Sequence, residues 1–291
     1  PKNPDPLLDP FANPTDDPAL PRVLIIGDSI SIGYTTRVRK LLAGKANVHR
    51  VQGNCRWSAY GAAHIDEWIG DGNWDVVHFN FGLWDWYGWS QDPKATPESY
   101  AQSLDHVVTR LKTTGAKLIF AKTTPPCIGP ERKVKIVVSE ERAEEFHRPA
   151  LAVMEKHGVA VNDLFRVIGD QRSTYQKGEN DVHYNDAGRD LLAAKVAEVI
   201  GEALTTSDQP KSDENAAFWP AKPSPAHKRI LFIAGNTKHR HGVHEYRAGS
   251  MLLAKALNES GLPVQAKTHW YGWPEDESIF DEVDSCVIYA D

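Results

Sequence analysis

The sequence, 291 residues long, predicts an α/β protein with a parallel, doubly wound sheet. Short apolar runs predict strands at residues 22–27, 47–51, 75–80, 117–122 and 159–162. Helical patterns separate these runs, near 33–43, 61–69, 97–114 and 139–157. Gly115 and Gly158 follow two of the helical patterns, where a helix stops before the next strand. Because strands and helices alternate at these lengths, each strand is expected to cross over to a parallel neighbour.

The end of the first predicted strand carries the clearest functional signal. Val23 to Ile26 form an apolar run, and Gly27, Asp28 and Ser29 follow it before a helical pattern. An apolar run that breaks at glycine before a helix indicates a strand-to-helix turn. Such turns lie at the carboxyl end of the sheet, where α/β proteins bind ligands. A serine there exposes its hydroxyl, and its N–H at a helix N-terminus suits a developing oxyanion.

The third predicted strand, 75–80, is followed by a run of aromatic residues. Trp84, Trp86, Tyr87 and Trp89 alternate there with polar and glycine residues. Binding residues gather on loops at strand ends, and tryptophan combines a large apolar face with a polar N–H. We therefore expect these side chains to line the substrate site and to face a sugar ring.

The last helical pattern of this unit, 187–204, begins close to a histidine. His183 precedes it on a predicted loop, Asp181 lies two residues earlier, and Asn185 or Asp186 is the expected N-cap. A carboxylate this close can fix the tautomer of the imidazole and stabilise the imidazolium. Since a serine is a weak nucleophile without a base, this histidine supplies what the serine needs.

This order of motifs resembles the SGNH, or GDSL-type, hydrolases over residues 20–206. The matching residues are Gly27, Asp28, Ser29 and Gly33 in the first block, and Asp181 and His183 in the last block. The resemblance implies a three-layer α/β/α sandwich on a five-stranded parallel sheet. It also implies an esterase or lipase, a class that includes carbohydrate O-acetyl esterases.

Two positions depart from the family pattern. Most relatives carry the aspartate at the position of Asn180, whereas here we assign the acid to Asp181. Trp84 stands where the third block of the family has an asparagine that binds the oxyanion. The resemblance therefore leaves Gly53, Asn54 or the indole N–H of Trp84 as further oxyanion donors.

Composition limits the function classes. The formal net charge is -6 without long runs, so a phosphate backbone, which needs basic patches, is not an expected partner. No apolar stretch reaches the length of a membrane span, so we expect no membrane partner. The mechanism requires no metal or organic cofactor. The sequence leaves the oligomeric state open, and the enzyme class leads us to expect a secreted or periplasmic protein.

The chain divides into four predicted parts. Residues 1–20 form an extended arm, 21–206 the hydrolase unit, 207–227 a proline-rich linker, and 228–291 the start of a second α/β unit. The last part resembles the beginning of a ThuA-like (trehalose-utilisation) domain. The matching residues are Ile233-Ala234-Gly235, His244-Glu245-Tyr246-Arg247-Ala248-Gly249, Gly272-Trp273-Pro274 and Val287-Ile288-Tyr289. Because this part is short for such a domain, we expect a partial ThuA-like unit.

Together these features predict a serine esterase that removes O-acetyl or other short acyl groups from a carbohydrate. His183 takes the proton from Ser29 Oγ, which attacks the ester carbonyl, while Asp181 orients His183. Water then cleaves the acyl-enzyme with the help of the same base. One alternative is a lipid or thioester acyl hydrolase that uses these three residues. The other is a non-catalytic sugar-binding module, which the missing third-block asparagine favours.

Overall fold

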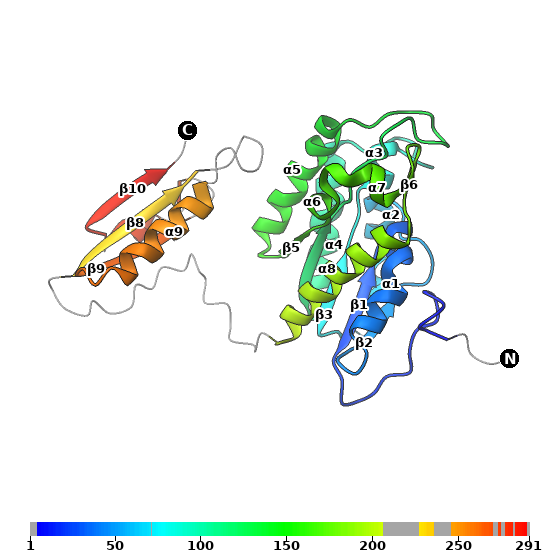
Figure 1. The fold of residues 1–291 in the computed structure, drawn as a ribbon, viewed down its shortest axis with the longest axis horizontal. Helices are drawn as coiled ribbons and strands as arrows, with labels where there is room; N and C mark the ends of the chain where they lie inside the picture. Colours follow the sequence, from blue (N-terminus) through cyan, green and yellow to red (C-terminus); the bar gives the residue numbers. More distant parts are fainter. Residues whose placement is uncertain are drawn as a thin grey trace. The chain divides into compact units, whose positions relative to one another are not determined.

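The computed structural model describes residues 5–70, 72–205, 227–235, 246–269, 273–274, 277–281 and 283–289. The chain forms two compact units, Pro1–Ser207 and Asp208–Asp291 (Figure 1).

The first unit is built on a five-stranded parallel sheet, which confirms the predicted fold class. Its strands are β1 (Arg22–Ile26), β2 (Asn47–Arg50), β3 (Val76–Phe79), β4 (Lys117–Lys122) and β5 (Ala160–Asp163). They lie in the order β2-β1-β3-β4-β5, and all neighbours are parallel. The chain therefore reverses its direction of travel across the sheet after β2, and β1 and β3 border a topological switch point. Open α/β sheets bind ligands outside the carboxyl ends of the strands at such a point.

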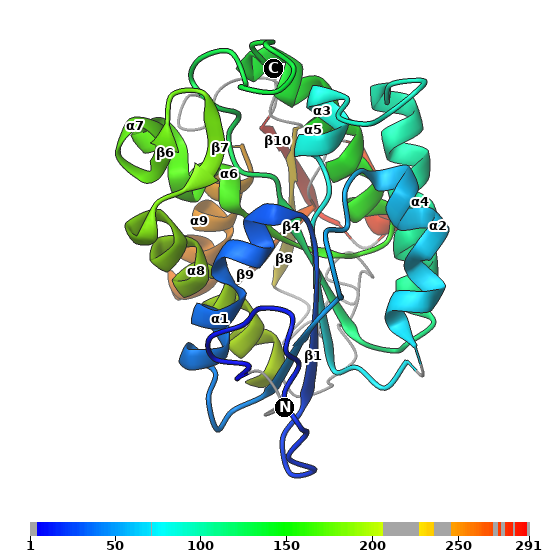
Figure 2. The ribbon, with the colours of Figure 1, turned by 90° about the vertical axis from the view of Figure 1, so that its right-hand side faces the viewer.

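Helices cover both faces of this sheet and complete the three-layer sandwich (Figure 2). They are α1 (Ser29–Leu41), α2 (Ser58–Ile69), α3 (Leu83–Tyr87), α4 (Pro97–Lys112), α5 (Glu140–Lys156), α6 (Leu164–Ile168), the 3-10 turn η1 (Gly169–Gln171), α7 (Arg172–Tyr175) and α8 (Asp186–Thr205). Helices α1 and α8 pack together on one face, and α2, α4 and α5 pack in sequence on the other. Because both faces are covered, the central strand β1 is apolar and buried from Val23 to Ile26.

Residues 5–20 lie against β2, the edge strand of the sheet. The Arg39 guanidinium of α1 donates to three backbone oxygens of this segment. The Asn13 side chain bonds the backbone N–H of Arg50 at 2.9 Å and its carbonyl at 3.0 Å. This segment therefore covers edge groups that would otherwise be open to pairing with another chain.

A short antiparallel hairpin precedes α8 and corrects the expectation that His183 lies on a loop. Its strands are β6 (Gln176–Gly178) and β7 (Asp181–Tyr184). Asn185 caps α8, because its side-chain oxygen accepts from the Gly188 N–H at 3.0 Å. The strands are too short for a period-two pattern to show in the sequence, so only the helix was predicted.

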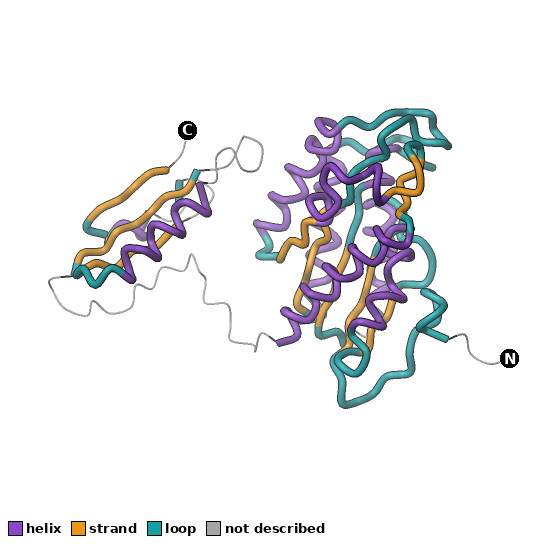
Figure 3. The backbone as a smooth tube through the Cα atoms, viewed as in Figure 1, coloured by secondary structure: helices purple, strands orange, loops and turns teal. Residues whose placement is uncertain are grey.

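The second unit is a three-stranded parallel sheet with a helix packed on it (Figure 3). Its elements are β8 (Lys228–Ala234), α9 (Tyr246–Glu259), β9 (Val264–His269), η2 (Glu277–Phe280) and β10 (Ser285–Tyr289). The strand order is β10-β8-β9. The predicted linker, 207–227, lies outside the described residues except for its last position. The resemblance to a ThuA-like domain stays a prediction.

Among the described residues, none of the helices combines the length and the apolar character that a membrane crossing requires.

Candidate active site

The turn after β1 places Ser29 at the first position of α1. The Asp28 carboxylate accepts from the Ile30 backbone N–H at 2.9 Å and thereby caps the helix. Because of this cap, α1 begins four residues before the pattern at 33–43 that sequence analysis singled out. The Ser29 N–H therefore belongs to a first helical turn, whose N–H groups have no partner within the helix.

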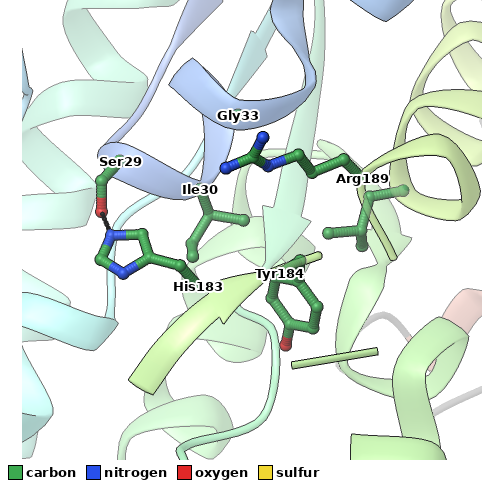
Figure 4. A pocket seen from close by; sticks show the side chains of 7 residues that line it. Ser29, Ile30, Gly33, His183, Tyr184 and Arg189 are labelled. Atoms are coloured by element: carbon green, nitrogen blue, oxygen red, sulfur yellow. Dashed lines mark hydrogen bonds between the residues drawn. The ribbon is translucent and has the colours of Figure 1, made fainter. Parts of the chain in front are cut away.

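His183 on β7 bonds Ser29 on one side and Asp181 on the other. Its Nε2 lies 2.9 Å from Ser29 Oγ (Figure 4). Its Nδ1 lies 2.5 Å from Asp181 Oδ1, which also accepts from the His183 backbone N–H at 3.0 Å. The three side chains thus form a hydroxyl–imidazole–carboxylate series, the arrangement that activates a serine nucleophile.

Asp181, and not Asn180, is the residue whose side chain bonds Nδ1 of the imidazole. The Asn180 side-chain oxygen instead lies beside Gly129, where an added Cβ would meet it at 2.2 Å. Burial raises the pKa of Asp181, but hydrogen bonds from His183 and the nearby Arg132 guanidinium outweigh burial, and the pKa lies below its ordinary value. The carboxylate is therefore charged where it contacts the imidazole.

Arg50, at the end of β2, connects the Ser29 turn to the neighbouring loop. The sequence patterns did not predict this role. Its buried guanidinium donates to the carbonyl of Gly27 at 2.8 Å and to those of Val51 and Gly53 at 2.5 and 2.6 Å. It also donates to the Ser31 hydroxyl at 3.0 Å. Burial lowers the pKa of Arg50. The only sequence signal was a cation at the end of a buried strand, which needs polar partners.

The loop after β2 carries two of the expected oxyanion donors. Gly53 is exposed and adopts a left-handed φ of 91°. The Asn54 side-chain oxygen accepts from the Arg56 N–H at 2.8 Å, so its amide N–H groups are the part that can donate to a substrate. The Cys55 N–H donates to the Gly27 carbonyl at 3.2 Å. This bond holds the loop beside the Ser29 turn.

The aromatic run after β3 forms helix α3 instead of a loop, and this corrects the expected role of three side chains. Trp86, Tyr87 and Trp89 are 4%, 0% and 9% exposed. Tyr87 stacks on Trp89 with ring centroids 4.6 Å apart, and the Trp89 indole donates to buried Glu131 at 3.1 Å. These three rings are part of the core, because Trp86 and Tyr87 lie on α3 and Trp89, just after the helix, stacks on Tyr87, so they do not form a sugar-facing surface.

Trp84, the fourth member of the run, stays half-buried and connects the buried rings to a second aromatic group, because its ring packs edge-on against Trp89 with centroids 5.5 Å apart. Its ring centroid lies 6.1 Å from that of Trp57, which in turn lies 5.4 Å from Tyr60. Trp57 precedes α2 and Tyr60 lies on it, and both are half-buried. The partly exposed aromatic surface is therefore formed by α3 and the start of α2 together.

The buried side chain of Asp85 connects α3 to the start of α2. The Ser58 hydroxyl donates to its carboxylate at 2.6 Å, and the Ser58 N–H lies 3.1 Å from both carboxylate oxygens. Burial raises the pKa of Asp85 to about 7, although the bonds from Ser58 oppose this shift.

A small cavity of about 20 Å³ borders Ser29 and His183 (Figure 4). Its other lining residues are Ile30, Gly33, Tyr184, Arg189 and Leu192. A space of this size holds a group comparable to one water molecule. Within the described part of the chain, no cluster of three or more His, Cys, Asp or Glu residues could hold a metal ion.

A parallel sheet with a topological switch point, and a hydroxyl–imidazole–carboxylate series at its carboxyl edge, are typical of esterases and acylhydrolases. The chain belongs to the GDSL-like lipase/acylhydrolase family, whose model matches residues 25–191. A comparison with curated protein sequences found no match.

Solved structures with the same fold include three esterases or acylhydrolases. An acetyl xylan esterase is 17% identical, with 62% of this chain and 99% of that chain covered and a TM-score of 0.52. A lipase/acylhydrolase from Enterococcus faecalis is 20% identical, with 62% and 96% covered and a TM-score of 0.52. A carbohydrate acetylesterase from Sinorhizobium meliloti is 15% identical, with 62% and 99% covered and a TM-score of 0.51. These likenesses establish the fold.

Proposed function

We propose that this protein is a serine esterase that removes acetyl or other short acyl groups from a carbohydrate. The observation that carries the proposal is the hydrogen-bonded series Ser29, His183 and Asp181. His183 Nε2 takes the proton from Ser29 Oγ, and Oγ bonds to the ester carbonyl carbon. The ester C–O bond then breaks as the imidazolium gives its proton to the departing sugar oxygen, which leaves as a hydroxyl, and water hydrolyses the acyl-enzyme with the same base.

The substrate class rests on two features beside this series. The cavity next to Ser29, about 20 Å³, has room for a methyl-sized group. The half-buried rings of Trp84 and Trp57 offer apolar surface of the kind that packs on sugar rings. The acetyl xylan esterase and the carbohydrate acetylesterase that share the fold act on substrates of this class, as their names state. We further propose a secreted or periplasmic location.

The direct test is acetate release from a panel of acetylated glycans. We expect the wild type to release acetate and Ser29→Ala to lose at least about a thousandfold in kcat, because no other group replaces the nucleophile. Ser103→Ala on α4, which removes a hydroxyl bonded only to its own helix, is the matched control and keeps wild-type activity. Undiminished turnover by folded Ser29→Ala would remove Ser29 from the mechanism.

Chain-length preference separates this proposal from its alternatives. We expect p-nitrophenyl acetate to be cleaved with a higher kcat/KM than p-nitrophenyl octanoate. A strong preference for octanoate would replace the carbohydrate proposal with a lipid acyl hydrolase. Glycan binding without acetate release, unchanged in Ser29→Ala, would indicate a sugar-binding module.

A further inference from the structure

We propose that Arg132, on the loop between β4 and α5, is a positioning residue that holds Asp181 in place for His183. The inference rests on the serine-esterase function proposed above. It adds a fourth residue to the proposed series, one that touches neither the nucleophile nor the base.

The Asp181 carboxylate divides its two oxygens between two partners. Oδ1 bonds His183, whereas Oδ2 lies 3.2 Å from Arg132 Nη1. A carboxylate held at both oxygens has little freedom to rotate away from the imidazole. The Arg132 side chain is 54% exposed, and ion pairs this open to solvent add little to stability. Its effect is therefore expected in the orientation and charge of the site.

The loop that carries Arg132 is fixed to the core by the residue before it. Glu131 is only 3% exposed, and its Oε2 accepts from the Trp89 indole N–H at 3.1 Å. The same oxygen accepts from the backbone N–H groups of Lys133 and Val134 at 2.9 and 3.0 Å. A buried carboxylate with three donors holds the loop in one conformation, so Arg132 starts from a fixed point.

The backbone of this loop is also bonded to the hairpin that carries Asp181. The Gly129 N–H donates to the Glu179 carbonyl at 2.7 Å, and the Arg132 N–H donates to the Asn180 carbonyl at 3.2 Å. These bonds place the loop alongside the two residues that precede Asp181. The guanidinium therefore reaches the carboxylate from a segment anchored on both sides.

The charged groups around His183 determine the electrostatic effect of Arg132. Buried Asp28 acts on His183 from the α1 side, and Asp181 and the cation of Arg132 lie on the other side. The Cys127 thiol is also close enough to Asp181 to be influenced by it, although burial is the main reason why its pKa is raised. Two further cations are near: Arg189 of α8 lines the cavity beside His183, and Arg50 acts on Asp28. Arg132 is the cation that pairs with Asp181, and a neighbouring cation opposes a second positive charge on the imidazole. The effect of removing this charge is therefore expected in the pH dependence of the reaction.

The test is the pH dependence of kcat/KM for p-nitrophenyl acetate in Arg132→Met. We expect the acid limb to move to higher pH by about half a unit, because the imidazole then binds a proton more readily. We expect kcat at the plateau to fall about tenfold with KM unchanged, since Arg132 orients Asp181 and does not touch substrate. Arg132→Lys should restore most of the limb position.

Lys133→Met is the matched control, because it removes one positive charge from the same loop. The Lys133 ammonium lies 5.9 Å from the Trp89 ring centroid, and its loss should leave the acid limb in place. An equal shift in Lys133→Met, or a wild-type limb and kcat in Arg132→Met, would overturn the proposal.

A second measurement separates failure of this inference from failure of the proposed function. In the Ser29→Ala background, the NMR signals of the His183 ring should titrate at higher pH once Arg132 is replaced by Met. This shift needs no turnover, so it tests the Arg132 contact even if acetate release fails. An unchanged ring titration would count against Arg132 whatever the activity.

Discussion

At the residue scale, two buried ionisable side chains connect segments of the candidate site. Arg50 connects the Ser29 turn to the loop after β2, and Asp85 connects α3 to the start of α2 through Ser58. Both occupy positions where an ion has lost water and bonds protein groups instead. Their burial gives measurable consequences for stability.

Asp85 should make the stability of the first unit depend on pH. Burial raises its pKa from 3.8 to about 7, so between these values the folded chain keeps a proton that the unfolded chain releases. The contribution of Asp85 to stability is fully present below its pKa in the unfolded chain, and it is lost as the pH rises through its pKa in the folded chain. Over this pH range the free energy of unfolding should therefore fall by ~3 kcal/mol more in the wild type than in Asp85→Asn, an isostere that does not titrate.

Urea denaturation at the two ends of this pH range measures the effect of Asp85. Asp170→Asn, at an exposed carboxylate, is the control and should keep the wild-type pH dependence. If Asp85→Asn loses as much stability with rising pH as the wild type does, the buried carboxyl is not the titrating group.

At the element scale, two helical glycines make opposite predictions. Gly61 on α2 packs against Phe81, and a Cβ there would lie 2.3 Å from the ring, whereas a Cβ on Gly201 of α8 meets nothing within 4 Å. Gly61→Ala should therefore lower the free energy of unfolding by about 1–3 kcal/mol, because the helix must move away from the sheet. Gly201→Ala should raise it by about 0.5–1 kcal/mol, since alanine is the better helix former. Chemical denaturation of both variants measures the difference, and a stabilised Gly61→Ala would contradict the close packing of α2.

At the scale of the whole molecule, all the residues of the candidate site lie in the first unit, Pro1–Ser207. A fragment with these residues should release acetate from the same glycans as the full chain, with kcat within about twofold. The reason is that the fragment keeps the sheet, both helix layers and the hairpin that carries His183. Acetate release per mole of folded protein, with folding followed by circular dichroism, measures this. A folded but inactive fragment would show that residues after Ser207 contribute to the reaction.

The sequence by itself predicted the fold class, and it predicted that Ser29, His183 and Asp181 lie together, as their hydrogen bonds show. The strand and helix patterns are local properties of the chain, so β1 to β5 were predicted within a residue or two of their observed bounds. Ser29 and His183 are 154 positions apart, yet each lies in a short motif next to a predictable helix start. Parallel topology then brings strand ends to one edge of the sheet, which is why local motifs were enough to name them.

Only the tertiary structure decided which side chains surround these three. Trp86, Tyr87 and Trp89 were expected to face substrate, but all three are buried in the core. Arg50 bonds Gly27 and Arg132 bonds Asp181 across segments that are distant in the sequence, and no pattern along the chain predicts these contacts. Exposure and ion pairing depend on what packs against a residue from distant segments, whereas periodicity records only its own element. For that reason the predicted nucleophile, base and acid came from the sequence, and the residues that hold them came from the fold.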